Sequence, residues 1–181
     1  MREEKVLLNA VVCYLIKNNK ICLALKTAKI GKGCLNGFGG GIEPGEIPVE
    51  AAIRELQEET DPDETKGVVA KACDLQKIAI NDSHNTKSDG QTFVCRVHFY
   101  LVHHWVGEIK DTETMVNADW YDIDSLPFRK MMPGDEDWLP AALSGQKVMA
   151  QIKLGPYQKE LLEKVRVDIV DAFPEEQVVH S

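Results

Sequence analysis

The first forty residues alternate between apolar runs and polar breaks, a pattern that predicts strands joined by turns. Val6–Ile16 and Ile21–Lys26 are rich in apolar and β-branched residues, and the polar segment Lys17–Lys20 lies between them. Because a short polar segment between two apolar runs is typical of a turn, these residues predict a β-hairpin. A loop dense in glycine, Gly31–Gly41, follows the hairpin.

The next segment, Pro48–Thr60, has the spacing of an amphipathic helix. Pro48 suits the first turn of a helix, because the N–H group that proline lacks has no intrahelical partner there. Apolar residues then recur at helical spacing, at Ala51, Ala52, Ile53 and Leu56. Pro62 disfavours helical backbone in the residue before it, so we expect the helix to end there.

The second half of the chain predicts more strands than helices. Val68–Ile80 favours one or two weak strands, and Gln91–Trp105 contains a strict alternation of apolar and polar residues. The apolar residues that share one face are Phe93, Cys95, Val97 and Phe99. The remaining segments predict a short helix at Asp135–Leu143, a strand at Val148–Leu154, a helical stretch at Gln158–Lys164 and a strand at Val165–Ile169. Mostly strands with two or three helices indicate one α/β or α+β domain.

Length and charge narrow the classes of partner. A chain of 181 residues is long enough to bury one continuous core. The formal net charge is −8, and an acidic surface repels the phosphate backbone of long nucleic acids. A small phosphorylated substrate still fits such a protein if a bound cation inverts the local field.

The N-terminus, the lengths of the apolar runs and the cysteines bear on localisation and redox state. The N-terminus, Met1–Lys5, mixes acidic and basic residues without a signal-peptide pattern, and no apolar run approaches the about eighteen residues of a membrane helix. We therefore expect a cytoplasmic protein with no membrane partner. The five cysteines are odd in number and show no C-x-x-C spacing, which favours buried reduced thiols over zinc ligands or disulfides.

The segment that points to chemistry is Gly40-x5-Glu46-x7-Arg54-Glu55-Leu56-x-Glu58-Glu59. Residues three and four apart on a helix share a face, so Glu55, Glu58 and Glu59 project together. Three neighbouring carboxylates repel one another, so two interpretations are open. The side chains lie on a solvated surface helix, or they surround a divalent cation that neutralises them. Mg²⁺ prefers oxygen ligands of this kind, shared with substrate phosphates. Seven residues at this spacing are expected by chance with a probability on the order of one in a million, which favours the metal site.

This segment resembles the Nudix box, G-x5-E-x7-R-E-U-x-E-E-x-G-U, in which U is a bulky aliphatic residue. Asp61 and Pro62 depart from it, because the family has Gly and an aliphatic residue at these positions. In the family these two positions end the helix and hold no metal. The resemblance implies an α/β fold, the Nudix α/β/α sandwich with a mixed β-sheet, as a single domain over residues 1–181.

Similarity to MutT-type Nudix enzymes, which act on oxidised purine nucleoside triphosphates, extends over roughly residues 6–155. Besides the box it is carried by Lys26, Gly31–Gly40, Trp120–Tyr121, Leu126–Phe128, Met132–Asp135 and Trp138–Pro140. The resemblance implies Mg²⁺-dependent hydrolysis, with Mn²⁺ as an alternative ion, of a nucleoside triphosphate to the monophosphate and diphosphate. A purine dNTP such as 8-oxo-dGTP is the candidate substrate. Hydrolysis of another nucleoside diphosphate derivative and a non-catalytic nucleotide-binding module are the alternatives.

The same resemblance assigns metal ligands and catalytic residues. The expected Mg²⁺ ligands are Glu55, Glu58, Glu59 and the backbone carbonyl of Gly39. Arg54 is expected to orient a glutamate by a charge-assisted bidentate contact, and Glu46 is expected to be structural.

Two further positions leave alternatives open. Many family members place an additional glutamate directly before a Met, but here Thr114 holds that position and Glu113 lies one residue upstream. The general base is therefore Glu55, Glu59 or Glu113. Lys26 lies where the family has a phosphate-contacting lysine, and an exposed lysine at a strand end is the alternative interpretation.

The resemblance also implies a base-binding end. The candidate substrate-binding residues there are Asn36, Met132, Asp135 and Trp138. The amide of Asn36 offers both a donor and an acceptor to a purine edge, and Trp138 is either a pocket wall or a core residue. At Gly134, where related enzymes have a second carboxylate, we expect a gap in the pocket and weaker discrimination for an oxidised purine.

Overall fold

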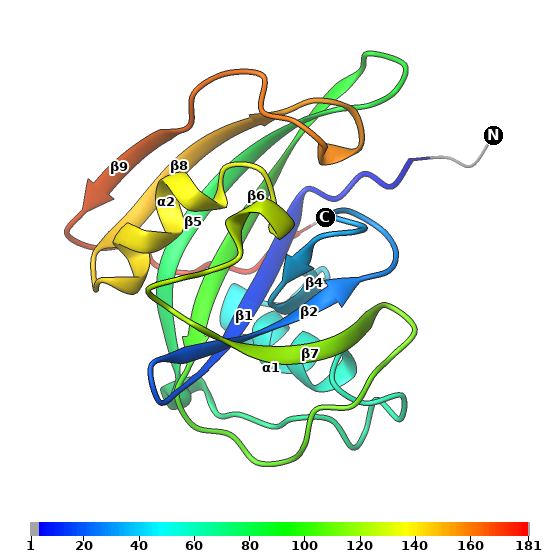
Figure 1. Ribbon diagram of the computed structural model, residues 1–181, viewed down its shortest axis with the longest axis vertical. Coiled ribbons are helices and arrows are strands. Elements are labelled where there is room, and N and C mark those ends of the chain that lie inside the picture. The colour runs from blue at the N-terminus through cyan, green and yellow to red at the C-terminus, as the bar shows by residue number, and fades with distance from the viewer. Residues whose placement is uncertain (1–3, 181) are drawn as a thin grey trace.

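A mixed β-sheet forms the centre of the protein, with a helix on each of its faces (Figure 1). The computed structural model describes residues 4–180. The strands follow the order β3-β2-β1-β6-β5-β8-β9, with β4 paired to β1 and β7 paired to β2. The β1–β6 and β5–β8 pairs are parallel, and the other pairs are antiparallel. The strands are β1 (Asn9–Lys17), β2 (Lys20–Lys26), β3 (Leu35–Asn36), β4 (Phe38–Gly41), β5 (Leu75–Thr86), β6 (Thr92–Val102), β7 (Met115–Asp122), β8 (Lys147–Leu154) and β9 (Arg166–Val170).

The two faces of the sheet carry separate hydrophobic cores under α1 (Pro48–Glu58) and α2 (Asp135–Leu143). Helix α1 packs against β1 and β4, and α2 packs against β5 and β8. Successive side chains of a strand point to opposite faces, so β1 sends Val11, Cys13 and Leu15 toward the α1 core and Tyr14 toward the α2 core. The predicted α/β/α sandwich with a mixed sheet is therefore confirmed. Among residues 4–180, no helix combines the length and the apolar character needed to span a membrane.

Helix α1 begins at Pro48, as predicted, and ends at Glu58, two residues before the predicted end. The turn that follows contains the departure from the family pattern. Asp61 is buried there, and its carboxylate accepts the backbone N–H of Asp63 at 2.8 Å and pairs with Lys110 Nζ at 3.3 Å. Hydrogen bonds of this side chain thus close the turn in which the family uses glycine.

The predicted hairpin is confirmed by the antiparallel pairing of β1 with β2, in which Ile16 faces Ile21. Its turn uses Asn18 and Asn19 with φ values of 53° and 61°, a left-handed conformation that asparagine tolerates better than most residues. The strict alternation in Gln91–Trp105 also forms a strand, β6.

Two predictions of secondary structure were wrong. Strand β5 starts at Leu75 and continues to Thr86, whereas the prediction ended at Ile80. Its second half is polar, so hydrophobic periodicity did not reveal it. The helix predicted at Gln158–Lys164 is absent: a short 3₁₀ turn ends at Gln158, which has a φ value of 55°, and irregular chain follows. The strand predicted at Val165–Ile169 is confirmed as β9.

The chain after β9 returns to the loop before α1. The backbone of Val179 bonds to both Gly45 and Glu46, with N–O distances of 2.8 and 3.0 Å. The carboxylate of Glu176 accepts the backbone N–H of Val49 in the first turn of α1 at 2.7 Å. We call residues 174–179 the C-terminal strap. We propose that the strap, β8 and β9 belong to one domain with the rest of the chain, because β8 and β9 extend the same sheet and the strap contacts α1.

The cysteines divide into two groups. Cys13, Cys22 and Cys95 are buried free thiols, as expected, and burial raises the pKa of Cys22 and of Cys95 to about 12. Cys34 is half-buried and Cys73 is exposed, so the expectation of buried thiols is wrong for Cys73.

Candidate active site

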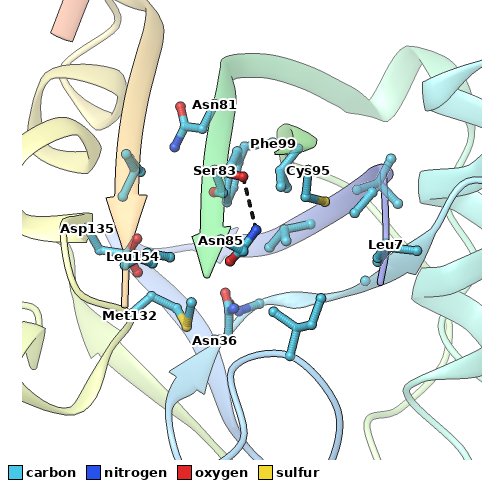
Figure 2. A pocket seen from close by; sticks show the side chains of 18 of the residues that line it. Leu7, Asn36, Asn81, Ser83, Asn85, Cys95, Phe99, Met132, Asp135 and Leu154 are labelled. Carbon is cyan, nitrogen blue, oxygen red and sulfur yellow. Dashed lines mark hydrogen bonds between the residues drawn. The ribbon is translucent and has the colours of Figure 1, made fainter. Parts of the chain in front are cut away.

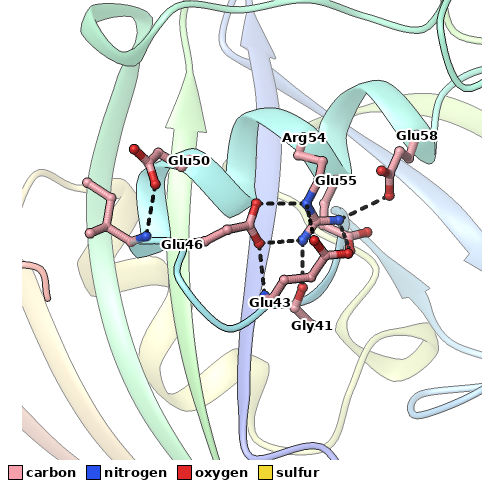
Figure 3. Close-up of polar contacts among 8 residues, drawn as sticks. Gly41, Glu43, Glu46, Glu50, Arg54, Glu55 and Glu58 are labelled. Carbon is pink, nitrogen blue, oxygen red and sulfur yellow. Dashed lines mark hydrogen bonds and ion pairs between the residues drawn. The ribbon is translucent and has the colours of Figure 1, made fainter. Parts of the chain in front are cut away.

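Arg54 lies at the centre of a hydrogen-bond network that joins α1 to the loop before it (Figure 3). Its Nε and Nη2 donate to the two carboxylate oxygens of Glu46, each at 2.8 Å. Nη2 also donates to the Gly41 carbonyl at 2.9 Å, and Nη1 donates to Glu55 Oε1 at 2.8 Å and to Glu58 Oε2 at 3.1 Å. The bonds from Arg54 hold the pKa of Glu46 below its usual value. One guanidinium therefore fixes both the loop and two of the acidic side chains.

Beside this network, a cavity of about 90 Å³ opens at the end of α1. We call it the acidic cavity after the carboxylates of Glu55 and Glu59, and its lining also includes Gly39, Gly40, Thr114 and three lysines, Lys5, Lys26 and Lys29. The backbone at Gly40 lies so close to α1 that a Cβ atom there would be 2.5 Å from Glu55 Oε2. Glycine at position 40 is thus required for the Glu55 carboxylate to occupy this place.

The predicted metal ligands are only partly gathered. Glu55, Glu59 and Gly39 line the acidic cavity, whereas the Glu58 carboxylate bonds to Arg54 and does not line it. Within residues 4–180, no three His, Cys, Asp or Glu side chains converge closely enough to form a complete metal site. Burial raises the pKa of Glu55, and the neighbouring Glu58 and Glu59 add to the rise while Arg54 opposes it.

Thr114 occupies the position at which related enzymes have a further glutamate, and it reaches the acidic cavity. Its Oγ1 donates to Glu59 Oε2 at 2.6 Å. The side chain of Glu113 is exposed and lines neither the acidic cavity nor the neighbouring pocket, while its backbone carbonyl accepts a hydrogen bond from Thr27 Oγ1. The structure thus brings Thr114 to Glu59 and leaves Glu113 outside.

A second, more apolar pocket of about 110 Å³ adjoins the acidic cavity (Figure 2). The two spaces share the lining residues Leu7, Lys26, Ile30, Gly39 and Gly40. Lys26 is half-buried between them, and burial lowers the pKa of its ammonium group, an effect opposed by Glu59. This placement disfavours the alternative of an exposed lysine at a strand end.

Three of the four residues predicted for the base-binding end, Asn36, Met132 and Asp135, line this apolar pocket (Figure 2). Asn36 Oδ1 accepts the backbone N–H of Gly37 at 2.8 Å, so its NH₂ group remains free to donate. Asp135 is buried, and burial raises the pKa of its carboxyl group to about 7. Trp138 is fully buried outside the pocket lining, and its Nε1 donates to Asp135 Oδ1 at 3.2 Å. Trp138 is therefore a core residue that positions Asp135.

The expected gap beside Gly134 does not exist. The residue has a φ value of +95°, a left-handed conformation that favours glycine. A Cβ atom there would meet Val165 Cγ2 at 3.1 Å, Ile152 Cγ2 at 3.4 Å and Leu161 Cδ2 at 3.4 Å. The space is filled by apolar side chains, so a carboxylate introduced at this position would strain the turn.

The sequence analysis missed one wall of the apolar pocket. Asn81, Ser83 and Asn85 line it from alternate positions of β5, opposite Cys95, Val97 and Phe99 of β6. Residues 81–85 are polar at every position, so the sequence shows no alternation that would separate this wall from a solvated loop. The shared face of Cys95, Val97 and Phe99 was predicted correctly.

Comparisons with known proteins agree with this geometry. Residues 6–142 match the NUDIX domain family. The chain is 31% identical over 140 residues to the oxidized purine nucleoside triphosphate hydrolase of Danio rerio, an alignment that covers 76% of this chain and 81% of that protein. It is 26% identical over 163 residues to the protein of the same name from Mus musculus, covering 87% and 92% of the two chains. The crystal structure of the MutT protein from Bacillus halodurans superposes with a TM-score of 0.69 at 20% identity, covering 90% of this chain and 98% of that one.

The chain therefore belongs to the Nudix family, and the protein is a Nudix pyrophosphohydrolase. The structural likeness independently shows the MutT-type fold.

Proposed function

We propose that this protein hydrolyses a purine nucleoside triphosphate to the monophosphate and diphosphate, with 8-oxo-dGTP or a related purine dNTP as its substrate. The observation that carries the proposal is the contact between the acidic cavity and the apolar pocket, which share Lys26, Gly39 and Gly40. A nucleoside triphosphate has the matching layout, because its phosphates and its base lie at opposite ends of the molecule. The names of the relatives from Danio rerio and Mus musculus support the same substrate class.

The residues of the acidic cavity suit Mg²⁺, or Mn²⁺ in its place. The donors are hard carboxylate and carbonyl oxygens, and a cation would offset the burial and the repulsion from Glu58 and Glu59 that together raise the pKa of Glu55. Glu55, Glu59 and the Gly39 carbonyl would hold the ion, with Glu58 as the further ligand implied by the family. When bound, the ion would neutralise phosphate charge and lower the pKa of a water molecule.

The protein's own groups have distinct roles in this proposal. Lys26 contacts the phosphates from between the two spaces, where its charge is only partly solvated. Arg54 holds Glu55 in place through its bond to Oε1, and its bidentate contact with Glu46 fixes the guanidinium itself. The general base is Glu55, Glu59 or Glu113. The hydrogen bond from Thr114 orients the Glu59 carboxylate, which favours Glu59 among these three.

In this proposal three residues of the apolar pocket contact the base. Asn36 presents donors to the base, and Met132 gives it an apolar, adaptable surface. A carboxyl with a pKa of about 7, such as that of Asp135, donates a hydrogen bond when neutral and accepts one when ionised. Trp138 acts through Asp135.

A turnover assay tests the proposal. The purified chain is incubated with purine and pyrimidine triphosphates, 8-oxo-dGTP, a nucleotide sugar and a dinucleoside polyphosphate, with and without Mg²⁺ or Mn²⁺, and released phosphate and diphosphate are measured separately. We expect metal-dependent release of diphosphate and monophosphate from a purine triphosphate. If the nucleotide sugar or the dinucleoside polyphosphate is turned over faster, the substrate is of that class and the proposal of a purine triphosphate is wrong. Binding of nucleotides without any turnover would indicate a non-catalytic module.

A further inference from the structure

Asn85 places a buried hydrogen-bond acceptor without a partner at the wall of the apolar pocket (Figure 2). Its side chain is buried, with 2% of the residue exposed, and its Nδ2 donates to the backbone carbonyl of Ser83 at 3.0 Å. Among the residues that the structure describes, nothing donates to its Oδ1. Because a carbonyl can only accept, the bond to Ser83 fixes the NH₂ group on that side and turns the oxygen away from it.

Asn36 is anchored in the opposite sense. Its oxygen is used by the backbone N–H of Gly37, so its NH₂ group is the free part of the amide. Both asparagines line the same pocket, one from β3 and one from β5. The pocket therefore offers a donor at Asn36 and an acceptor at Asn85, each held by a backbone contact that specifies its orientation.

A buried acceptor without a partner is costly, and such groups in native proteins call for an explanation. Asn85 is not required to complete the hydrophobic core, and an apolar residue at this position would avoid the cost. A ligand that donates an N–H group to Oδ1 explains both the residue type and its orientation.

We propose that Asn85 determines base specificity, by accepting a hydrogen bond from an N–H group that some purines carry and others lack. This inference rests on the function proposed above. Two N–H groups have the required chemistry. An 8-oxopurine carries a hydrogen on N7, where an ordinary purine has a lone pair, and a guanine-type base carries an exocyclic 2-amino group that hypoxanthine lacks.

The test compares kcat/KM for 8-oxo-dGTP, dGTP and dITP in the wild type and in Asn85→Leu and Asn85→Ala. The two variants remove the acceptor with and without filling its space. If N7–H is the donor, the variants lose roughly ten- to a hundredfold on 8-oxo-dGTP alone, the usual effect of leaving a buried group unpaired. If the 2-amino group is the donor, they lose a similar factor on 8-oxo-dGTP and dGTP and keep dITP. Retained dITP turnover also shows that the variant is folded.

His84→Ala is the matched control. His84 is the neighbour of Asn85 on β5, its side chain points to the opposite face, and its Nε2 contacts Gln151 Oε1 at 2.7 Å. The wild-type ratios among the three nucleotides should persist in this variant. If His84→Ala shifts these ratios as Asn85→Leu does, the shift comes from a general disturbance of β5 and the inference is overturned.

The remaining outcomes separate the two proposals. If the wild type cleaves all three nucleotides with equal kcat/KM, or if both Asn85 variants lose all three equally, the specificity inference is wrong while the proposed function stands. If the wild type cleaves none of them, the proposed function fails and the inference fails with it.

Discussion

The acidic cavity and the apolar pocket adjoin each other, but their polar groups are held in opposite ways. Beside the acidic cavity the charged groups of the α1 network are densely paired, and the single side chain of Arg54 contacts Gly41, Glu46, Glu55 and Glu58. In the apolar pocket polar groups are few, and Asn36 and Asn85 each keep one hydrogen-bonding group free. A dense network fixes the position of reacting groups, whereas sparse free groups select a partner. We therefore expect changes at the acidic cavity to alter turnover of every substrate, and changes in the pocket to alter ratios between bases.

The largest effect is expected from Glu59→Gln. This change keeps the size of the side chain and its bond to Thr114, but it removes the charge that faces the acidic cavity. We expect kcat to fall roughly a hundredfold or more for every nucleotide, with weaker Mg²⁺ binding and an unchanged melting temperature. Glu64→Gln, at an exposed glutamate in the loop after α1, is the control.

Glu58→Gln sharpens the same test, because Glu58 bonds to Arg54 and does not line the acidic cavity. The family resemblance makes it a metal ligand, so this variant is also expected to lose activity. Normal Mg²⁺-dependent turnover by both the Glu58 and the Glu59 variants would place the active site elsewhere.

The second largest effect is expected from Arg54→Lys. Lysine keeps the charge but lacks the planar fork that holds Glu46, so the network around Glu55 loosens. We expect kcat/KM to fall about tenfold for all bases, and the free energy of unfolding to fall by about 1–3 kcal/mol in urea titrations.

The chain offers a matched control for this change. Arg96 makes the same two-bond contact with Asp82, at 2.8 and 3.0 Å, lines neither the acidic cavity nor the apolar pocket, and has about half of its side chain exposed. Arg96→Lys should leave kcat/KM unchanged and cost at most about 1 kcal/mol of stability. Equal losses of activity in the two variants would show that the position of Arg54 at the acidic cavity is irrelevant.

Asp135→Asn is expected to change stability in a pH-dependent way. Burial raises the pKa of this carboxyl from 3.8 to about 7, so the folded protein retains a proton that the unfolded chain releases. Folding stability supplied by the neutral carboxyl is present below the unfolded pKa and is lost as the pH rises to about 7. The variant should therefore gain stability relative to the wild type across this interval, on the order of 1.4 kcal/mol per pKa unit. Urea unfolding at several pH values measures the difference, and a difference that does not vary with pH would contradict the burial argument.

The smallest effect is expected from Glu176→Gln in the C-terminal strap. Burial acts to raise the pKa of Glu176, but hydrogen bonds from Lys77 and Tyr100, with the backbone N–H of Val49, outweigh it and hold the pKa below its usual value. The stability contributed by the carboxylate is present above the unfolded pKa and is lost as the pH falls through the folded pKa.

At neutral pH we expect Glu176→Gln to lower the free energy of unfolding by about 1–2 kcal/mol, with kcat/KM nearly unchanged. The loss should shrink in acid. Glu175→Gln, at the exposed neighbouring residue, should change neither quantity. A large loss of activity in the Glu176 variant would mean that the strap, through its bonds to Glu46, belongs functionally to the acidic cavity.

Several features of the protein were predictable because they are local in the sequence. The helix of the box, its start at Pro48 and the shared direction of its glutamates depend on residues three and four apart. The β1–β2 hairpin and the apolar face of β6 depend on equally short patterns. For the same reason Arg54, which contacts Glu46, Glu55 and Glu58 within eight residues of itself, was recognisable as an orienting residue.

Tertiary structure decided the contacts that join distant segments. Thr114 reaches Glu59 across 55 residues, and Glu176 reaches Val49 across 127. The polar wall of β5 was invisible to hydrophobic periodicity, because polar side chains on a buried face have the same sequence pattern as a solvated loop. The filled space at Gly134 depends on Ile152, Leu161 and Val165, which only the folded chain brings beside it. The sequence by itself thus determined the helix face that carries the clustered glutamates, and the fold determined the shape and polar lining of the pocket beside it, since local spacing specifies a helix face and only the packing of remote strands shapes a pocket.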